Sequence, residues 1–365
     1  MTSVANIPTH FIKRGSAFFV ANAESNQVSP TLPVGNYIIG RTPTGDFYLD
    51  RVDSFTPVPK LYGNTTKHAS RIIRTFLDRS AATGVMLVGE KGSGKTLLSR
   101  QLAMDGAALG IPTIIINAPW CGDAFNQFIQ SLTQPCIILF DEFEKVYDRE
   151  DQEKILTLLD GVFPSKKMFV LTTNDKYRVD VHMRNRPGRI YYMIEFGGLD
   201  EEFIREYCAD NLNNKDHVDG LCRVALAFDV FCFDVLKALV EEMNRYGETA
   251  SEATELLNTK PDLAGDQTYD VMSLVVAGVA IAENMVDDKY WRGNPLRNSG
   301  GLTIDYYVRS KEEGEEPDMK RAVFEQADLQ QIDVASGNFK YANKVGDVLV
   351  LKRQSPTGFD YRNLF

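Results

Sequence analysis

Several kinds of feature are scarce in this sequence, and their scarcity limits what the protein can be. Its 365 residues include only five cysteines, an odd number with no Cys-x-x-Cys pair, so neither a disulfide framework nor a cysteine zinc site is expected. No apolar run is long enough to cross a bilayer, and residues 1–20 lack the charged, apolar and small-residue order of a secretory signal. We therefore expect a soluble, cytoplasmic protein with no membrane partner.

Positive charge is also in short supply. The chain has 40 lysines and arginines against 50 aspartates and glutamates, which gives a net charge of -10. Because the field of such a protein repels polyanions, the composition does not favour nonspecific nucleic-acid binding. The hydrophobic fraction of 44% and the charged fraction of 25% are those of an ordinary globular protein. The length allows two or three domains.

Strand and helix signals divide the chain into four parts. Residues 1–60 alternate apolar segments with turn residues and predict a small β-rich element. In residues 61–198 continuous apolar runs alternate with helical patterns, which is typical of a parallel sheet flanked by helices. Residues 199–262 change to the 3.6-residue period of a small helical domain. Residues 263–365 predict a buried helix, over the apolar run Leu274–Ala282, together with a β-rich element.

The runs that predict the buried strands of the α/β part are continuous rather than alternating, as expected when both faces of a sheet are covered. They are Val85–Val88, Thr113–Ile116, Cys136–Phe140 and Met168–Thr172. A helix over Thr65–Arg79 precedes the first of them, and Asp200 is the predicted N-cap of the first helix after the sheet.

The first of these runs is followed by a glycine-rich loop of a specific kind. Residues 89–96, GEKGSGKT, fit the pattern G-x-x-x-x-G-K-[ST] between a strand and a helix. In such a loop backbone N–H groups surround phosphate oxygens, the Lys95 ammonium reaches the β- and γ-phosphates, and the Thr96 hydroxyl ligates Mg²⁺. The following helix adds its positive N-terminal end. The residues predicted to hold the nucleotide are Gly89, Lys91, Gly92, Ser93, Gly94, Lys95, Thr96 and Leu97.

A pair of carboxylates follows a later strand. The run CIILFDE, residues 136–142, ends in Asp141 and Glu142 at the edge of the predicted sheet. Beside a phosphate loop, the Asp141 carboxylate is expected to hold Mg²⁺ through water and the Glu142 carboxylate to polarise the attacking water. The next strand leads to Asn174, whose uncharged amide can orient that water and contact the γ-phosphate.

Three arginines gather around the segment NRPGR. Arg184, Arg186 and Arg189 stand beside the fixed turn at Pro187, after a loop and out of reach of the same chain's phosphate loop. That placement predicts arginine fingers that act on the nucleotide of a neighbouring subunit, where such a charge contributes ~10³- to 10⁵-fold in rate. A basic surface turn without a catalytic role is the alternative.

Together these motifs resemble the AAA branch of the AAA+ ATPases. GEKGSGKT, CIILFDE, LLDG at residues 158–161, VLTTN and NRPGR occur in the order and spacing of that branch, over about residues 60–245. The resemblance implies an α/β P-loop core with a small helical lid, ATP and Mg²⁺ as cofactors, and hydrolysis of ATP to ADP and phosphate. It also implies a homo-oligomeric ring, usually a hexamer, in which Arg186 and Arg189 face the neighbour's nucleotide.

The resemblance extends to three shorter segments. LDG, at residues 159–161, resembles the intersubunit signalling stretch of the family. Leu61-Tyr62-Gly63 occupies the place of the family's adenine-contacting segment, so Tyr62 and Gly63 are predicted to contact the base. In the lid, Phe233-Asp234 is similar to the pattern of the AAA branch.

One segment departs from the family pattern. AAA unfoldases usually carry an aromatic residue, an aliphatic residue and a glycine some way beyond the second strand, where they line the pore of the ring. Here Pro119-Trp120-Cys121-Gly122 follows that strand directly. Trp120 is therefore either a pore residue that grips a substrate chain or a packing residue. The short loop and the TTN…RPGR segment look closest to the mitochondrial Rieske-protein translocase group, whose membrane helix this sequence lacks.

The leading functional interpretation is a chaperone-like ring that couples ATP hydrolysis to the unfolding, threading, assembly or disassembly of a protein partner. One alternative is an ATP-regulated structural or assembly factor, whose β-rich ends bind the partner without threading. Another is a nucleic-acid motor or loader, which requires a basic channel that the sequence does not display.

Overall fold

The computed structural model of the chain describes most of its residues. These are 9–14, 17–22, 29–58, 60–160, 166–226, 228, 230–258, 267–295, 301–308, 317–333 and 336–354. Contacts between residues divide the chain into two compact units. The first consists of Met1–Pro59, Thr66–Val88 and Lys95–Glu195, and the second of Lys60–Thr65, Gly89–Gly94 and Phe196–Phe365.

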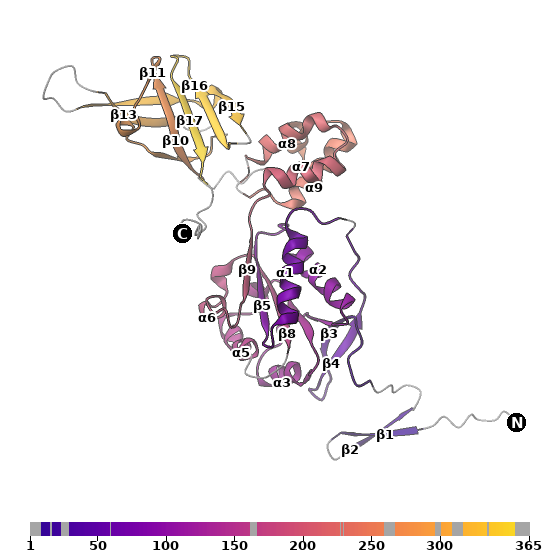
Figure 1. Cartoon of the computed structure of the whole chain (residues 1–365). Coiled ribbons are helices and arrows are strands. Elements are labelled where there is room, and N and C mark those ends of the chain that lie inside the picture. The colour runs from indigo at the N-terminus through magenta and orange to yellow at the C-terminus, as the bar shows by residue number, and fades with distance from the viewer. Residues whose placement is uncertain are drawn as a thin grey trace. The chain divides into compact units, whose positions relative to one another are not determined.

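The first unit is built on a seven-stranded sheet with the strand order β4-β3-β6-β7-β8-β5-β9 (Figure 1). The strands from β3 to β5 along this order run parallel to one another. The strands are β3 (Asn36–Arg41), β4 (Phe47–Val52), β5 (Thr83–Gly89), β6 (Thr113–Ile116), β7 (Cys136–Phe140), β8 (Lys167–Thr173) and β9 (Tyr192–Phe196). Every residue of β7 and β8 is buried, as the continuous apolar runs predict.

Helices accompany this sheet in the first unit. They are α1 (Thr65–Asp78), α2 (Lys95–Ala108), α3 (Asp123–Ser131), α4 (Phe143–Val146), α5 (Arg149–Leu159) and α6 (Val181–Arg184). Helix α2 contacts β6, β7 and β8, and α4 contacts β8. The α/β class predicted from the sequence is therefore confirmed.

The segment before residue 60 extends the same sheet. Strands β3 and β4 form an antiparallel hairpin, and β3 pairs in parallel with β6 from Asn36↔Thr113 to Ile38↔Ile115. Only β1 (Thr9–Arg14) and β2 (Ala17–Asn22) form a separate two-stranded sheet among the described residues before α1. The hydrogen bonding of the sheet thus continues across the boundary that the sequence suggests at residue 60.

A small helical cluster follows in the second unit. Its helices are α7 (Glu201–Asn211), α8 (Val218–Ala225), α9 (Phe233–Tyr246) and α10 (Ala250–Leu256), which share one apolar core. The predicted cap is present, because the Asp200 side chain accepts a hydrogen bond from the Phe203 N–H at 2.8 Å. At the other end of the cluster, Thr249 and Glu252 form a capping box on α10.

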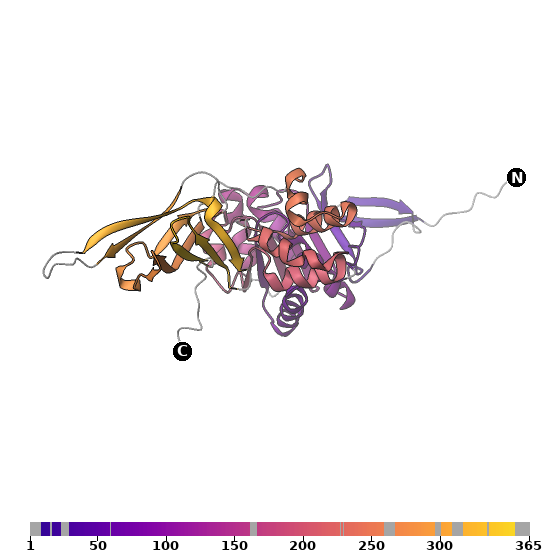
Figure 2. The ribbon, with the colours of Figure 1, turned by 90° about the horizontal axis from the view of Figure 1, so that it is seen from above.

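The last part of the chain is a β-rich region whose strands lie together in both views (Figure 1, Figure 2). One sheet has the order β11-β10-β17-β16-β15, with β12 beside β10, and β13 and β14 form a hairpin. The strands are β10 (Gln267–Val276), β11 (Val279–Ala280), β12 (Tyr290–Gly293), β13 (Leu302–Val308), β14 (Asp318–Phe324), β15 (Leu329–Asp333), β16 (Asn338–Ala342) and β17 (Val348–Arg353).

The helix predicted over Leu274–Ala282 is wrong. These residues form the end of β10, a turn and β11, with Val276 paired to Val279. The turn residues Ala277 and Gly278 both have positive φ, at 48° and 78°, which is the conformation of a tight hairpin turn. Valines flank this turn on both sides, and their β-branched side chains favour an extended backbone.

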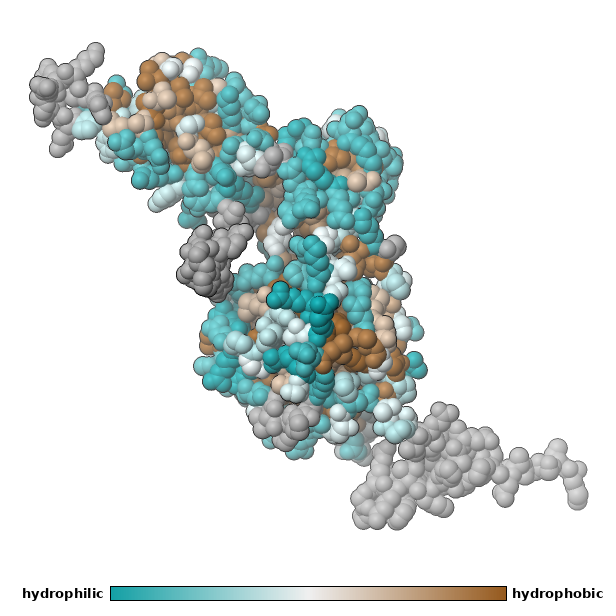
Figure 3. Space-filling model, in the orientation of Figure 1, coloured by the Kyte–Doolittle hydropathy of each residue, from teal (hydrophilic) through white to brown (hydrophobic). Residues whose placement is uncertain are grey.

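The surface of the β-rich region includes apolar area, drawn brown over these strands in Figure 3. Met272 on β10 and Val279 on β11 are among the exposed large hydrophobic residues of this region. Within the part of the chain that the structure describes, no helix combines the length and the apolar character needed to cross a membrane.

Candidate functional site

The phosphate loop lies between a buried strand and a long helix, as its motif requires. Strand β5 ends at Gly89, and α2 begins at Lys95. Gly92 and Gly94 have φ values of 78° and 105°, which side chains other than glycine rarely adopt. The hydroxyl of Ser93 is buried without a hydrogen-bond partner in the described residues. An orphaned hydroxyl within a glycine-rich turn fits a loop that receives phosphate oxygens.

The other residues of the phosphate loop differ in exposure and in their contacts. Lys91 is exposed, and Thr96 and Leu97 occupy the first turn of α2, where Thr96 faces solvent. Gly92 accepts a hydrogen bond from the Phe233 N–H at 3.1 Å, at the start of α9. A Cβ atom at Gly92 would lie 2.6 Å from a carboxylate oxygen of Asp234, and the positive φ of this residue favours glycine there. The predicted pair Phe233-Asp234 therefore adjoins the phosphate loop.

Lys95 is the buried cation of the site, with an exposed fraction of 7%. Its ammonium donates a hydrogen bond to Asn174 Oδ1 at 3.0 Å. Burial lowers the pKa of Lys95, and the carboxylates of Glu144, Asp141 and Glu142 oppose that shift. The structure thus brings together the lysine, the carboxylate pair and the asparagine that the sequence singles out.

The carboxylate pair is held by a threonine that is not among the predicted site residues. Thr172, on β8, donates its hydroxyl hydrogen to Asp141 Oδ1 at 2.6 Å and accepts one from the Glu142 N–H at 2.8 Å. Glu142 has a left-handed backbone, with φ 48° and ψ 46°. Such a conformation is unfavourable for glutamate. The Thr172 hydrogen bond therefore supports a strained turn that carries the predicted water-polarising group.

The carboxylate of Glu142 is about half exposed and forms an ion pair with Lys145 at 2.6 Å. This pairing raises the pKa of Lys145. Exposed ion pairs contribute little to stability and are easily exchanged for other partners. Glu142 can therefore turn from Lys145 to a water molecule at modest cost.

Asn174 joins both sides of the site. Its Oδ1 atom accepts a hydrogen bond from Lys95. Its backbone N–H and its side-chain Nδ2 both donate to Glu144 Oε1, at 3.0 and 2.9 Å. Glu144 lies two residues after Glu142, on α4, and is not among the site residues that the sequence predicts. The third carboxylate of the DEFE segment is the signal that could have identified it.

The three arginines have different surroundings. The Arg189 guanidinium is buried, with an exposed fraction of 8%, and forms a bidentate pair with Asp160, through Nε and through Nη2 to Oδ2 at 2.6 Å. It also donates to the His182 carbonyl at 2.7 Å. Arg184 lies over the ring of Tyr177, 5.0 Å from its centroid. Arg186 is exposed, so it is the arginine of this turn best placed to reach a neighbouring molecule.

The Arg189 pair also connects two motifs of the sequence. Asp160 is the C-cap of α5 and belongs to the LLDG stretch, whose Gly161 lies outside the described residues. The turn is packed closely on β5, because a Cβ at Gly84 would lie 1.8 Å from the Arg189 carbonyl oxygen. The arginine turn is therefore fixed to both α5 and β5.

We expect Arg189→Ala to lower the free energy of unfolding by about 2 kcal/mol at pH 7, the usual contribution of hydrogen bonds to a charged partner. Arg186→Ala, its exposed control, should change it by less than about 0.5 kcal/mol. Arg189 lowers the pKa of Asp160, so the pair's stabilisation is present above the ordinary carboxyl value and is lost as the pH falls through the folded value. Urea unfolding at pH 7 and pH 3 measures both effects. Equal losses for the two variants at pH 7 would contradict the structural role of Arg189.

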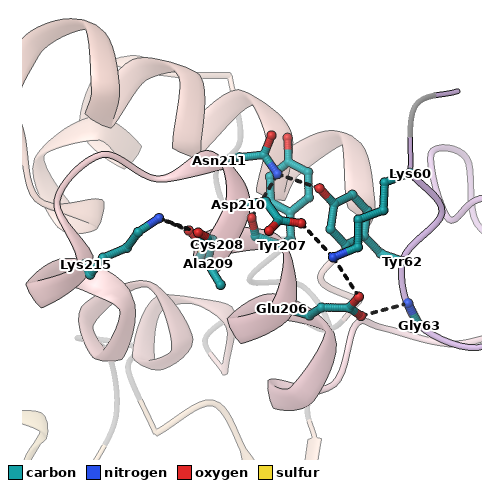
Figure 4. A network of polar contacts seen from close by, with 10 residues as sticks. All are labelled: Lys60, Tyr62, Gly63, Glu206, Tyr207, Cys208, Ala209, Asp210, Asn211 and Lys215. Atoms are coloured by element: carbon teal, nitrogen blue, oxygen red, sulfur yellow. Dashed lines mark hydrogen bonds and ion pairs between the residues drawn. The ribbon is translucent and has the colours of Figure 1, made fainter.

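The segment predicted to contact the base lies against helix α7 (Figure 4). The Tyr62 hydroxyl accepts a hydrogen bond from Asn211 Nδ2 at 2.8 Å. Its ring meets that of Tyr207 edge-on, with centroids 5.0 Å apart, and lies 6.0 Å from the ring of Phe203. Tyr62 is thus part of an aromatic cluster of the second unit.

Gly63 is anchored to the same helix. Its N–H donates to Glu206 Oε2 at 3.2 Å, and the Lys60 ammonium pairs with Asp210 at 2.7 Å and Glu206 at 3.2 Å (Figure 4). Gly63 has a positive φ of 62°, and a Cβ there would lie 2.7 Å from the Phe203 ring. The segment predicted to contact the adenine base, residues 61–63, is therefore anchored to α7.

Trp120 is partly buried and packs against other rings. Its ring meets that of Phe47 edge-on, with centroids 5.4 Å apart, and Phe47 also contacts Phe128. The Trp120 indole N–H faces Asn117 Oδ1 at 3.4 Å, and its carbonyl accepts from the Tyr147 hydroxyl at 3.1 Å. Of the two interpretations of this residue, these contacts favour packing.

Comparison with known families adds to this geometry. Residues 85–197 match the model of the ATPase family associated with various cellular activities (AAA). Residues 85–197 thus form an AAA ATPase domain. The matched residues contain the phosphate loop, the carboxylate pair, Asn174 and the arginine turn, whereas Tyr62 and Gly63 precede them.

Two curated relatives and one solved structure illustrate the similarity. The chain is 29% identical to the human peroxisomal ATPase PEX1 over 53% of its own length and 17% of that protein. It is 32% identical to the ribosome biogenesis ATPase RIX7 of Saccharomyces cerevisiae over 30% of its own length and 15% of that protein. The AAA domain of FIGL-1, solved in complex with ADP, matches with a TM-score of 0.42 and 16% identity, over 58% of this chain and 87% of that one. The chain therefore spans about a sixth of the length of these two curated relatives.

Proposed function

We propose that this chain hydrolyses ATP at the site formed by the phosphate loop, Asp141, Glu142 and Asn174. One observation carries the proposal: the Asn174 amide and the carboxylates that follow β7 converge on one buried ammonium, that of Lys95. These are the residue types that hold a triphosphate and activate water in P-loop ATPases. The family supports the same reaction, because its members are ATPases.

Each residue has a distinct task in this proposal. The backbone N–H groups of residues 89–96 and the Lys95 ammonium bind the phosphates. Glu142 accepts a hydrogen bond from water and directs its oxygen toward the γ-phosphorus, while Asn174 orients that water. The bond between the γ-phosphorus and the bridging oxygen breaks, so that ADP and phosphate are the products. Mg²⁺, held by Thr96 and Asp141, would neutralise the charge that develops on the phosphate oxygens.

We propose further that the active species is a ring of identical chains, six by analogy with the family, in which Arg186 completes the neighbour's site. The support is that Arg186 is exposed, whereas the Arg189 guanidinium is paired with Asp160 of its own chain. A heterologous contact that closes on itself gives a cyclic assembly. Because the arginine turn is fixed to β5 and α5, a movement of Arg186 on contact with a neighbour's nucleotide can be transmitted to the parallel sheet.

The proposed ring is tested by mixing. Arg186→Ala chains added to wild-type chains should lower ATPase activity more steeply than in proportion to their fraction, because each variant disables a neighbour's site. Arg74→Ala, an exposed arginine on α1, is the matched control and should leave the activity unchanged. A strictly linear decline with Arg186→Ala would mean that each chain holds a complete site.

We propose a protein as the partner that the ring remodels, in line with the acidic composition. The contacts of Trp120 with Phe47 favour the version in which ATP controls assembly without threading a chain past this residue. ATPase rates measured with an unfolded protein, with DNA or RNA, and with neither separate the possibilities. Stimulation by an unfolded protein supports threading, stimulation by nucleic acid contradicts the protein partner, and no stimulation supports the assembly factor.

A further inference from the structure

Glu144 is a buried carboxylate for which the proposed chemistry has no task. Its exposed fraction is 9%, and its Oε2 atom is buried without a hydrogen-bond partner in the described residues. Burying a carboxylate in this way is costly, so a compensating contact is expected. The other oxygen, Oε1, makes that contact: it accepts hydrogen bonds from the backbone N–H and from the side-chain Nδ2 of Asn174, at 3.0 and 2.9 Å.

The two neighbours of Asn174 fix the direction of its amide. An amide has one accepting end and one donating end. The accepting end, Oδ1, faces the Lys95 ammonium at 3.0 Å, and the donating end, Nδ2, faces the Glu144 carboxylate at 2.9 Å. A rotation that exchanged the two ends would place N–H groups against the ammonium and an oxygen against the carboxylate. Both contacts would then become repulsive, so only one orientation is stable.

We propose that Glu144 is a positioning residue, which holds Asn174 with its amide oxygen toward Lys95 and the phosphate loop so that this oxygen accepts a hydrogen bond from the attacking water. The inference rests on the proposed ATP hydrolysis and assigns to it a residue that acts through Asn174. Glu144 itself contacts neither water nor phosphate in this role, because Asn174 lies between it and Lys95. The backbone hydrogen bond from Asn174 to Glu144 also fixes the loop that follows β8.

A positioning role differs measurably from that of a counter-charge to Lys95. Glu144→Gln keeps an oxygen that can accept from Asn174 and places its NH₂ where Oε2 has no partner, but it removes the charge. Glu144→Ala removes both the oxygen and the charge. If Glu144 acts by orienting the Asn174 amide, Glu144→Gln retains most of the ATP turnover and Glu144→Ala does not.

The decisive experiment is a double-mutant cycle on kcat and KM for ATP, with the full chain. Glu144→Ala and Asn174→Ala should each lower kcat by about 10²-fold, the loss typical of a misplaced reacting group, with KM changed only a few-fold. The double variant should be no slower than Asn174→Ala alone, because Glu144 acts through Asn174. Glu144→Gln should stay within several-fold of wild type. Glu144→Met, which fills a similar volume, replaces Glu144→Ala if that variant does not fold.

The control is Asn126→Ala, which removes a buried amide that donates to the Lys154 carbonyl and to Thr157, elsewhere in the first unit. It should lower stability without lowering kcat. Losses that multiply in the double variant, or a Glu144→Gln variant as slow as Glu144→Ala, would overturn the positioning role while leaving ATP hydrolysis intact. A wild-type chain without ATPase activity would instead remove the proposed function and this inference with it.

Discussion

Glu142→Gln is expected to bind MgATP as tightly as the wild-type chain and to release phosphate about 10³-fold more slowly. The amide fills the same space and keeps the backbone hydrogen bond to Thr172, so the turn after β7 is preserved. It loses the negative charge that draws a proton from water, and general bases of this kind contribute about 10²- to 10⁴-fold in rate. Binding is measured by calorimetry with MgATP, and turnover by phosphate release.

The matched control for this variant is Glu153→Gln, an exposed glutamate on α5 that should hydrolyse ATP at the wild-type rate. Equal turnover in the wild type and in Glu142→Gln would remove the assignment of Glu142 to the water. A loss of MgATP binding in Glu142→Gln would show instead that the residue supports the fold of the site.

Lys95→Ala is expected to abolish nucleotide binding. The ammonium is buried at the start of α2, and removing one partner of a buried charged contact costs about 10²-fold in affinity or more. The fold should survive, because burial lowers the pKa of Lys95, so the ammonium pays a desolvation cost in the folded chain that its removal relieves. Calorimetry with MgATP measures the affinity, and thermal unfolding checks the fold.

Lys67→Ala, an exposed lysine on α1, is the control and should bind MgATP as the wild type does. A Lys95→Ala chain that still binds MgATP with unchanged affinity would place the nucleotide elsewhere. A Lys95→Ala chain that fails to fold would contradict the view that its burial is unfavourable.

Much of the fold could be predicted because the relevant signals are local. The strands β5 to β8 are continuous apolar runs, and Asp200 caps α7 through a hydrogen bond to a residue three positions later. The hairpin at Leu274–Ala282 could not be told from a helix by hydrophobicity alone, since a short apolar run fits both. Its valines and the residues Ala277-Gly278 decide in favour of strands once the pairing of Val276 with Val279 is seen.

The site could be predicted in part for a similar reason. The phosphate loop, the carboxylate pair and Asn174 follow strands whose order places them at one edge of the sheet. The contacts of Thr172, Glu144 and Asp160 could not be predicted, because they depend on partners about 30 residues away in the sequence. The same applies to Arg189, whose pairing with Asp160 gives it surroundings different from those of the exposed Arg186.

ATP hydrolysis by this chain is tested most directly by a single-turnover reaction with the wild-type chain in excess over MgATP labelled in its γ-phosphate. The proposed hydrolysis predicts that the label leaves as inorganic phosphate together with an equal amount of ADP, and that under the same conditions Glu142→Gln holds intact ATP. Label that remains in ATP with the wild-type chain, or that is released equally fast by both proteins, would contradict it.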